Sequence, residues 1–282
     1  MTVAAGAIRP MTAADTGPAA ELLRTHDFGD RLDFFTWAVT QPTVRAFVAE
    51  RDGAIVGTGV ASAQGPVGWV GVIFVTPSIR GEGLGRRITQ VVIEHLESAG
   101  CRTQILIASP LGRVLYERMG FEVIERQVRF TIDGLPPGDD PGDPRVRPFA
   151  ADDLDAVVRL DRAVTGGDRS AILRELVTPA SACVAVDRSG AVRGWLARGP
   201  FRGGAVIAPD PDDGLRLLER RRYTTGISGK AGAGLMSGNQ VGRERLRAAG
   251  WTEELGGVRM HRGERLEWNP LGVWGQFSGA IG

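Results

Sequence analysis

The 282-residue chain has few cysteines, few histidines and almost no charge imbalance. Its two cysteines, Cys101 and Cys183, lie far apart and form no CxxC pair, which argues against a disulfide framework and favours a reducing, cytoplasmic setting. The three histidines are scattered and form no HExxH or Cys/His cluster, so the sequence predicts no metal site. A formal net charge of +1 gives no bias toward nucleic acid or an anionic membrane.

Uninterrupted apolar segments are also missing. The alanine-rich N-terminus has no basic segment followed by an apolar stretch, so no signal peptide is predicted. The range 53–79 carries no formal charge, but glycines and the two prolines Pro66 and Pro77 interrupt it. This composition is typical of strands and turns rather than of a membrane helix.

Residues 133–144 read Asp-Gly-Leu-Pro-Pro-Gly-Asp-Asp-Pro-Gly-Asp-Pro. A segment made almost entirely of proline, glycine and aspartate cannot bury a core and restricts its own backbone. We interpret it as a linker that divides the chain into an N-terminal domain, 1–132, and a C-terminal domain, 145–282.

The two predicted domains resemble each other in sequence. Ile-Arg-Pro at 8–10 recurs as Val-Arg-Pro at 146–148, and Gly-Asp-Arg at 29–31 recurs unchanged at 167–169, so both pairs are 138 residues apart. Later matches keep an offset of 137 and then of 130. Offsets that stay fixed and change only at definable insertions predict two copies of one fold.

Each copy is predicted to be mixed α/β. In the first copy, the range 85–99 is predicted to be a helix that Gly100 terminates. Its apolar face is Leu84, Ile88, Val91, Val92, Leu96 and Ala99. His95 borders this face, which favours a histidine at the edge of the core. Further helices are expected near 19–23 and at 111–119, and strands at 46–49, 55–61, 68–76 and 104–108.

A glycine-rich segment, Arg80-Gly-Glu-Gly-Leu-Gly-Arg86, joins the last of the uncharged strands to this helix. At such a junction, free backbone N–H groups and the positive helix end favour a phosphate or pyrophosphate. A Walker A loop would need Gly-Lys-Ser/Thr where Gly85-Arg86-Arg87 stands, and a Rossmann fingerprint would need glycine at position 86. A nucleotide-binding protein that uses this loop differently stays an alternative.

The pattern Arg80-x-x-Gly83-x-Gly85, after a strand ending near Val75, resembles the coenzyme A signature of the GNAT N-acetyltransferase superfamily. The later segment 109–121, which ends in Gly-Phe, resembles that superfamily's second motif. The resemblance implies an α/β fold with two tandem GNAT-like domains, each a mixed, mostly antiparallel sheet flanked by helices. It also implies transfer from acetyl-CoA to a small-molecule or peptide amine in a ternary complex.

The resemblance further implies which residues bind and react. Tyr116 matches the tyrosine that protonates the departing thiolate in many members, with a core tyrosine as the alternative. Ser109 stands where members often have asparagine and is expected to contact the pantetheine arm. The backbone or side chains expected to hold acetyl-CoA are, in addition, those of Ile73, Phe74, Val75, Arg80, Gly81, Glu82, Gly83, Leu84, Gly85 and Arg86.

One departure from the family concerns the base. Members often place a glutamate on the central strand, whereas the range 69–76 has no acid. Water, or an acid from elsewhere such as Asp33, would then deprotonate the amine. Asp30 and its match Asp168 are predicted to be helix N-caps. The missing acid also motivates a second hypothesis, a non-catalytic acyl-CoA-binding or sensory protein.

The second copy lacks the glycine signature. Its range 208–214 brings three acids to the place that a pyrophosphate would need, and Leu246 takes the position of Tyr116. We therefore predict that this domain binds no CoA and shapes the acceptor pocket. The uncharged tail, 268–282, is expected to complete the second core, with an acceptor cleft or a homodimer contact as alternatives.

Overall fold

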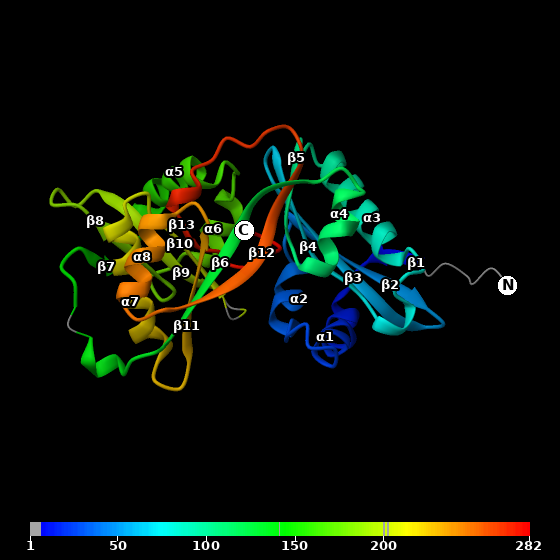
Figure 1. The fold of residues 1–282 in the computed structure, drawn as a ribbon, viewed down its shortest axis with the longest axis horizontal. Coiled ribbons are helices and arrows are strands. Elements are labelled where there is room, and N and C mark those ends of the chain that lie inside the picture. The colour runs from blue at the N-terminus through cyan, green and yellow to red at the C-terminus, as the bar shows by residue number, and fades with distance from the viewer. Residues whose placement is uncertain (1–6, 141, 200, 202) are drawn as a thin grey trace.

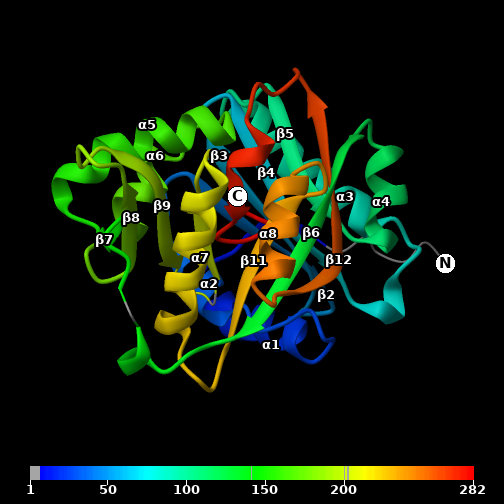
Figure 2. The same ribbon diagram turned by 60° about the vertical axis from the view of Figure 1, so that its left-hand side comes forward.

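The computed structural model describes residues 7–140, 142–199, 201 and 203–282. Two halves lie side by side, each with helices packed on strands (Figure 1). Figure 2, which is turned by 60°, shows that the long strands β6 (Glu122–Asp133) and β12 (Thr252–Gly263) run through the middle of the molecule and join the two halves. The mixed α/β class predicted from the sequence is thereby confirmed.

The halves repeat the same order of helices and strands. The first half contains β1 (Ala7–Pro10), α1 (Thr16–Arg24), α2 (Leu32–Ala38), β2 (Val44–Arg51), β3 (Ala54–Gln64), β4 (Val67–Val75), α3 (Leu84–Ser98), β5 (Thr103–Ala108), α4 (Pro110–Glu117) and β6 (Glu122–Asp133). The second contains β7 (Val146–Pro148), α5 (Leu154–Thr165), α6 (Ser170–Leu176), β8 (Ala182–Val186), β9 (Val192–Gly199), β10 (Gly203–Ile207), α7 (Pro211–Thr225), β11 (Lys230–Met236), α8 (Gln240–Ala248), β12 (Thr252–Gly263) and the additional β13 (Val273–Gly275).

The equivalence of the halves extends to single side chains. Arg9 donates two hydrogen bonds to the carboxylate of Asp15, at 2.7 and 2.8 Å. Arg147 donates the same two bonds, at the same distances, to Asp153. Each aspartate also accepts a bond from the backbone amide three residues before it. The fixed offset of 138 therefore reflects a repeated structure at the start of each copy.

The larger sheet is built from both halves. Its eight strands have the order β1-β2-β3-β4-β5-β12-β6-β11. β12 comes from the second half but lies between β5 and β6 of the first, and β6 in turn lies between β12 and β11 of the second. β6 of the first half and β12 of the second are thus exchanged between the halves, and the predicted linker at 133–144 begins at the end of β6.

The smaller sheet has the order β13-β10-β9-β8-β7. β13 comes from the C-terminal tail, pairs antiparallel with β10, and packs against β11 on its other side. Trp274 in β13 is fully buried, and its Nε1 donates a 3.0 Å hydrogen bond to the carbonyl oxygen of Ala208. The tail therefore completes the second core, as expected.

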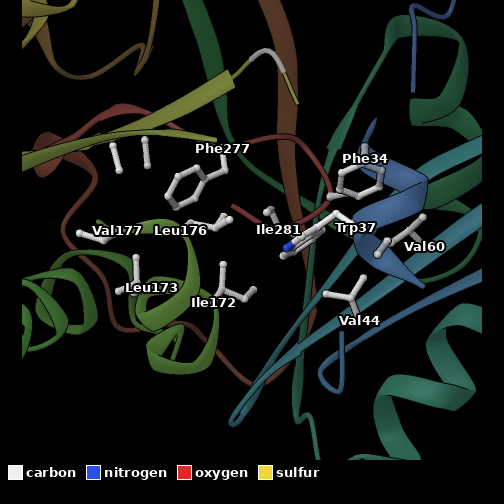
Figure 3. Close-up of a cluster of buried hydrophobic side chains, with 14 of the residues drawn as sticks. Phe34, Trp37, Val44, Val60, Ile172, Leu173, Leu176, Val177, Phe277 and Ile281 are labelled. Atoms are coloured by element: carbon white, nitrogen blue, oxygen red, sulfur yellow. The ribbon is translucent and has the colours of Figure 1, made fainter. Parts of the chain in front are cut away.

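One apolar core runs across both halves (Figure 3). At its polar margin, Trp37 Nε1 of α2 donates a 2.9 Å hydrogen bond to Glu175 Oε1 of α6. These positions are 138 residues apart, so equivalent residues of the two copies meet each other, as at a two-fold axis. The labelled core residues are Phe34, Trp37, Val44 and Val60 from the first half and Ile172, Leu173, Leu176, Val177, Phe277 and Ile281 from the second.

The helix α3 packs through most of the predicted stripe, because Leu84, Ile88, Val92 and Leu96 are buried. Val91 is half-buried, and Ala99 is exposed because the helix ends at Ser98. His95 packs edge-on against Phe47, with ring centroids 5.7 Å apart, and burial lowers the pKa of its imidazole. This placement agrees with a histidine at the edge of the core.

The uncharged range 53–79 forms β3 and β4, as predicted, joined to the next helix by a short turn. No helix in the described ranges has the length and apolar character needed to cross a membrane. Both cysteines are free. Within the same ranges, no group of three or more His, Cys, Asp or Glu side chains is arranged to hold a metal ion.

Candidate active site

The parallel strands β4 and β5 separate from each other. Residues 67–69 pair with residues 103–105, and beyond Trp69 no further pair joins the two strands in the described structure. β4 also bulges, since Val72 has a φ of 49° and the hydroxyl of Thr58 donates a 2.8 Å bond to its carbonyl oxygen. A bulge bends a strand and leaves backbone groups unpaired. The edge of β4 that faces β5 is therefore open.

The side chains at the end of β4 fix the strand in place. The Phe74 ring packs between the rings of His26 and Phe28, at centroid distances of 5.6 and 5.4 Å. Val75 packs into a small apolar cluster at the start of α3. Ile73 lies in the wall of a cavity. The side chains of Phe74 and Val75 are therefore packed inside the protein. A ligand at the open edge of β4 would contact the backbone of residues 73–75.

The turn after β4 needs glycine for its backbone. Gly81 has a φ of 90° and Gly83 a φ of 81°, values that side chains other than glycine rarely adopt. Gly83 is the N-cap of α3, which begins at Leu84. The signature glycines thus place the helix N-terminus directly after the turn.

The space around this turn is open. A Cβ added at Gly81 or Gly83 would meet nothing within 4 Å, and one at Gly85 would only touch side-chain atoms at 3.7 Å. The amides of Leu84, Gly85 and Arg86 lie in the first helical turn, where no intrahelical acceptor exists and the helix dipole is positive. These residues therefore fit the pyrophosphate of a coenzyme A group.

The charged side chains of the turn have different roles. Arg80 Nε donates a 3.1 Å bond to the carbonyl oxygen of Val75, which holds the arginine over the end of β4. Glu82 forms a 2.6 Å ion pair with Arg51, so its charge is compensated. Arg86 is exposed on the first turn of α3. The turn therefore presents cationic groups and backbone amides toward an anion.

The second predicted motif lies on α4. Ser109 is the N-cap, and its hydroxyl oxygen accepts a 3.2 Å bond from the amide of Gly112. Tyr116 follows two turns later and is buried, with its ring edge-on to Phe121 at 5.8 Å. Burial raises the pKa of Tyr116 to about 12. Its phenol is therefore protonated at neutral pH.

A cavity of about 320 Å³ lies where β4 and β5 separate. It brings together three of the predicted site residues, Ile73, Ser109 and Tyr116. The other nine predicted residues, which lie at the end of β4 and in the glycine turn, are not part of its wall. The remaining wall includes Phe28, Asp30, Arg31 and Phe34 from the first half and Phe277, Ser278, Gly279 and Ala280 from the tail.

The acid at this cavity is Asp30 rather than Asp33. Asp33 is exposed on α2 and is not a lining residue, whereas Asp30 is one. Asp30 Oδ1 also accepts a 3.0 Å bond from the first amide of α2, and Asp168 makes the equivalent bond to the first amide of α6. The predicted N-cap positions are one residue off, because the N-caps are Arg31 and Arg169 and each aspartate bonds the first helical amide from the residue before the N-cap. The sequence repeat showed that Asp30 and Asp168 are equivalent. It could not show that Asp30 lies beside the cavity, because the other walls of the cavity come from segments distant in sequence.

Residues 13–121 match the acetyltransferase (GNAT) family. The match lies within the first half of the chain, which is therefore similar to GNAT acetyltransferases. The chain is 36% identical over 90 residues to mycothiol acetyltransferase from Streptomyces avermitilis. That match covers 30% of this chain and 29% of the relative, so the chain spans less than a third of the length of the curated relative it matches.

The fold of the whole chain is found in solved structures. A candidate acetyltransferase from Pyrococcus horikoshii has a TM-score of 0.82 and 19% identity, covering 100% of this chain and 98% of that chain. A tandem GNAT protein from the clavulanic acid biosynthesis pathway has a TM-score of 0.60 and 16% identity, covering 91% and 98%. At these identities the likeness shows the fold alone. It confirms the predicted tandem arrangement of two GNAT-like units.

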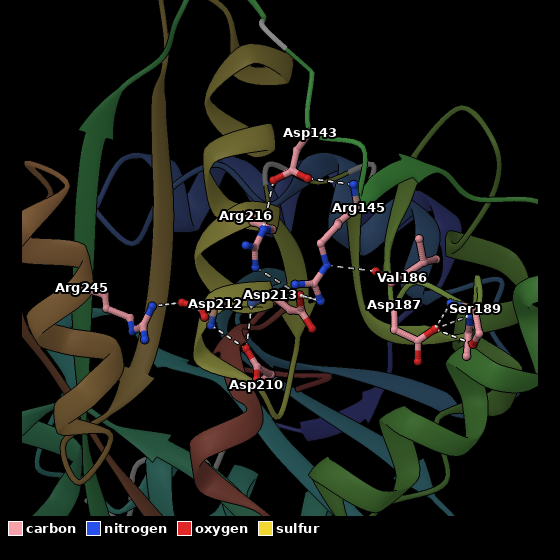
Figure 4. A network of polar contacts seen from close by, with 11 residues as sticks. Asp143, Arg145, Val186, Asp187, Ser189, Asp210, Asp212, Asp213, Arg216 and Arg245 are labelled. Atoms are coloured by element: carbon pink, nitrogen blue, oxygen red, sulfur yellow. Dashed lines mark hydrogen bonds and ion pairs between the residues drawn. The ribbon is translucent and has the colours of Figure 1, made fainter.

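The second GNAT-like unit has carboxylates where the first has its glycine turn (Figure 4). Asp210 caps α7 and accepts bonds from the amides of Asp212 and Asp213, at 2.8 and 3.3 Å. Asp213 is buried and pairs with Arg145 at 3.0 Å and with Arg216 at 3.5 Å. The first amides of α7 are therefore bonded to a carboxylate of the chain itself.

The gap between β10 and β11 is also filled. β13 lies there, at the place where the first unit has an open strand edge. A Cβ added at Gly214 of α7 would lie 2.2 Å from the Trp274 ring, so this glycine makes room for β13. Leu246, at the position of Tyr116, is fully buried. The second unit thus has neither the open edge nor the phenol.

Proposed function

We propose that this protein is an acyltransferase that moves the acetyl group of acetyl-CoA to an amine of a small molecule or peptide. The observation that carries the proposal is the combination of an open edge on β4, a glycine turn leading into α3, and Tyr116 in the adjoining cavity. The likeness to a relative named for acetyl transfer supports the reaction class.

The first unit would hold the donor. The backbone of residues 73–75 offers hydrogen-bonding groups to the pantetheine arm, and the first amides of α3 would bind the pyrophosphate. Arg80 and Arg86 would add charge-assisted bonds. The thioester supplies the activated acetyl group. The chain's own contribution is to hold that group beside the cavity that Tyr116 lines.

Two side chains would transfer the protons of the reaction. Tyr116 Oη would give its proton to the sulfur as the C–S bond breaks and the new C–N bond forms, because a phenol with a pKa of about 12 is fully protonated at neutral pH. Asp30 is an exposed carboxylate on the same cavity wall. It would accept the first proton of the incoming ammonium, directly or through water, and so replace the acid that the central strand lacks. The second proton that the nitrogen loses as it becomes an amide would restore the Tyr116 phenol through water.

We propose that the two domains have the different roles that the sequence predicts. The first domain, 1–132, would bind acetyl-CoA, and the second, 145–282, would bind none and would shape the acceptor pocket, with 133–144 as the connection between them. The second domain contributes the wall formed by residues 277–280. Carboxylates at the start of α7 and the inserted β13 support the absence of a second donor site.

A steady-state assay tests the proposal. The full chain is mixed with acetyl-CoA and a panel of amines, and the release of free CoA thiol is followed at varied concentrations of both substrates. Direct transfer in a ternary complex predicts saturation by both substrates and intersecting reciprocal plots. Parallel plots would contradict direct transfer. Tight acetyl-CoA binding with no turnover for any amine would favour the non-catalytic hypothesis instead.

A further inference from the structure

A second, larger cavity lies outside the proposed donor site. Its volume is about 700 Å³, and it lies between the strand pair β6–β11 and the strand pair β9–β10, with the end of α7 beside it. Gln127 of β6 and Gln276 of the tail both line it, and they are joined by a 2.9 Å hydrogen bond. The glycine turn at residues 80–86 is not part of its wall.

The wall of this cavity is strongly basic. It contains Arg129, Arg198, Arg221 and Lys230, and none of the described residues that line it is acidic. The chain as a whole has a net charge of only +1, so the four cations are a local concentration. No ion pair is formed by any of the four within the described part of the chain. A concave surface lined by one sign of charge attracts ions of the other sign.

Arg221 forms the buried part of this wall. It is 8% exposed, and its Nη1 donates a 2.8 Å bond to the carbonyl oxygen of Gly232. Its Nη2 has no hydrogen-bond partner among the described residues. Burial, together with the charge of Arg198, lowers the pKa of Arg221 to about 10, which still leaves it charged at neutral pH. A buried, charged donor without a partner is unfavourable.

The backbone around Arg221 makes room for its guanidinium. A Cβ added at Gly204 of β10 would lie 2.2 Å from Nη2, and one at Gly275 of β13 would lie 3.3 Å from Nη1. Side chains at either position would fill the space that the guanidinium uses. An anion in the cavity would compensate the positive charge of Arg221 and would reduce the repulsion between Arg198 and Arg221.

We propose that this basic cavity binds a carboxylate or phosphate group carried by the acyl acceptor. The assignment to the acceptor rests on the proposed function. The basic cavity and the cavity with Tyr116 share the wall residues Ile107, Ser278 and Gly279, so they adjoin each other. An acceptor would place its anionic end near Arg221 and its amine near Tyr116. The substrate class is therefore an amine that also carries an acidic group.

Binding of small probes to the full chain, without acetyl-CoA, tests the site itself. Calorimetric titrations would use phosphoethanolamine and β-alanine as anionic amines, ethanolamine as the amine without the anion, and inorganic phosphate as the anion alone. We expect saturable binding of phosphate and of at least one anionic amine, and none of ethanolamine. Absence of saturable binding for all the anionic probes, or equal binding of ethanolamine, would overturn the proposal.

Substitutions in the wall of the basic cavity test whether the anion binds there. Arg129→Gln and Lys230→Gln each remove one exposed wall cation without disturbing the core, and each should weaken anion binding about tenfold. Arg221→Gln should weaken it further if the variant folds. Arg188→Gln, an exposed arginine outside both cavities, makes the same change in net charge and should have no effect. Equal weakening by the control, or no weakening by either wall variant, would contradict the assignment.

A titration with acetyl-CoA separates this proposal from the proposed function. Arg129→Gln and Lys230→Gln should leave the affinity for acetyl-CoA unchanged, since the glycine turn lies outside the basic cavity. Weaker acetyl-CoA binding in these variants would show that the cavity serves the donor and would overturn the acceptor assignment. If no variant and no wild-type protein binds acetyl-CoA while phosphate still binds, the transferase proposal fails and the anion site remains.

Discussion

Tyr116 combines burial with a place on the wall of the proposed acceptor cavity. Burial favours the neutral phenol, and a pKa of about 12 keeps the proton available over the whole physiological range. The other tyrosine, Tyr223, lies on α7 and lines neither cavity. The two tyrosines therefore form a natural pair of test and control.

Tyr116→Phe should lower kcat about a hundredfold or more, because it removes the proton donor and keeps the ring. The affinity for acetyl-CoA should stay unchanged, and Tyr223→Phe should change neither quantity. In the wild-type protein, loss of the Tyr116 proton should cause no decline of kcat below about pH 10, since its pKa is about 12. Unchanged kcat in Tyr116→Phe would contradict the assigned role.

The paired residues Arg147 and Asp153 make a prediction about stability. Asp153→Asn should lower the free energy of unfolding at pH 7 by about 1 kcal/mol, less than a buried charged hydrogen bond contributes, because the arginine is partly exposed. Arg147 lowers the pKa of Asp153 in the folded state. The stabilisation is thus fully present above about pH 4 and is lost as the pH falls through the lower folded value.

Urea denaturation of wild type and Asp153→Asn at pH 7 and at pH 3 measures this effect. The difference between them should shrink at pH 3, which lies below the ordinary pKa of aspartate, because Asp153 of the unfolded chain then binds a proton. Asp152→Asn, at the exposed neighbouring carboxylate, is the control and should change stability little. A larger difference at low pH would contradict the argument.

At the scale of helices and strands, the sequence predicted those elements that depend on residues close together in the chain. The apolar stripe of α3, the strands on either side of the turn at Asp52 and Gly53, and the glycine turn all depend on residues close in sequence. Only the start of α2 was predicted, through the expected cap at Asp30, because its seven residues are too few to show a helical period. The exchange of β6 and β12 and the insertion of β13 join distant segments, so no local pattern contains them.

The candidate site divides in the same way. The glycine turn and Tyr116 were visible as motifs, and the repeat pointed to Asp30 and Asp168, which lie one residue before the N-caps of α2 and α6. The basic cavity was not predicted, because Arg129, Arg198 and Lys230 come from three strands that meet only in the folded chain. Its signal in the sequence is weak, since the four cations are spread over about a hundred residues.

Gly85→Ala tests the first turn of α3. The added methyl group would point between Val75 and Leu115 at ordinary contact distances, and alanine favours a helix, so the melting temperature should be equal or higher. The same methyl group would enter the space assigned to the pyrophosphate and should weaken acetyl-CoA binding at least about tenfold. Gly17→Ala in α1, which also meets no close neighbour, is the matched control. Unchanged affinity in Gly85→Ala would contradict the donor site.

At the scale of the molecule, shared strands and a shared core join the two units. β12 and β6 each lie between strands of the other unit, and the apolar core of Figure 3 contains residues of both. Neither unit can unfold without exposing the edge of the other's sheet. A fragment that begins at residue 145 would lack β6, so the second unit is best studied in the full chain.

We therefore expect the full chain to unfold in one transition, although it contains two copies of the fold. Urea curves followed by tryptophan fluorescence and by far-ultraviolet circular dichroism should coincide. The slope of the free energy against urea should correspond to a chain of 282 residues rather than to half of it. Two separated transitions would contradict the coupling that the exchanged strands imply.

The most direct test of the central claim is a calorimetric titration of the full chain with acetyl-CoA, with ATP and NAD as controls. The structure predicts one acetyl-CoA per chain, because the second unit has carboxylates and β13 in the equivalent positions. Arg80→Ala should weaken this binding, and ATP and NAD should not bind. Two molecules of acetyl-CoA per chain, or none, would contradict the account.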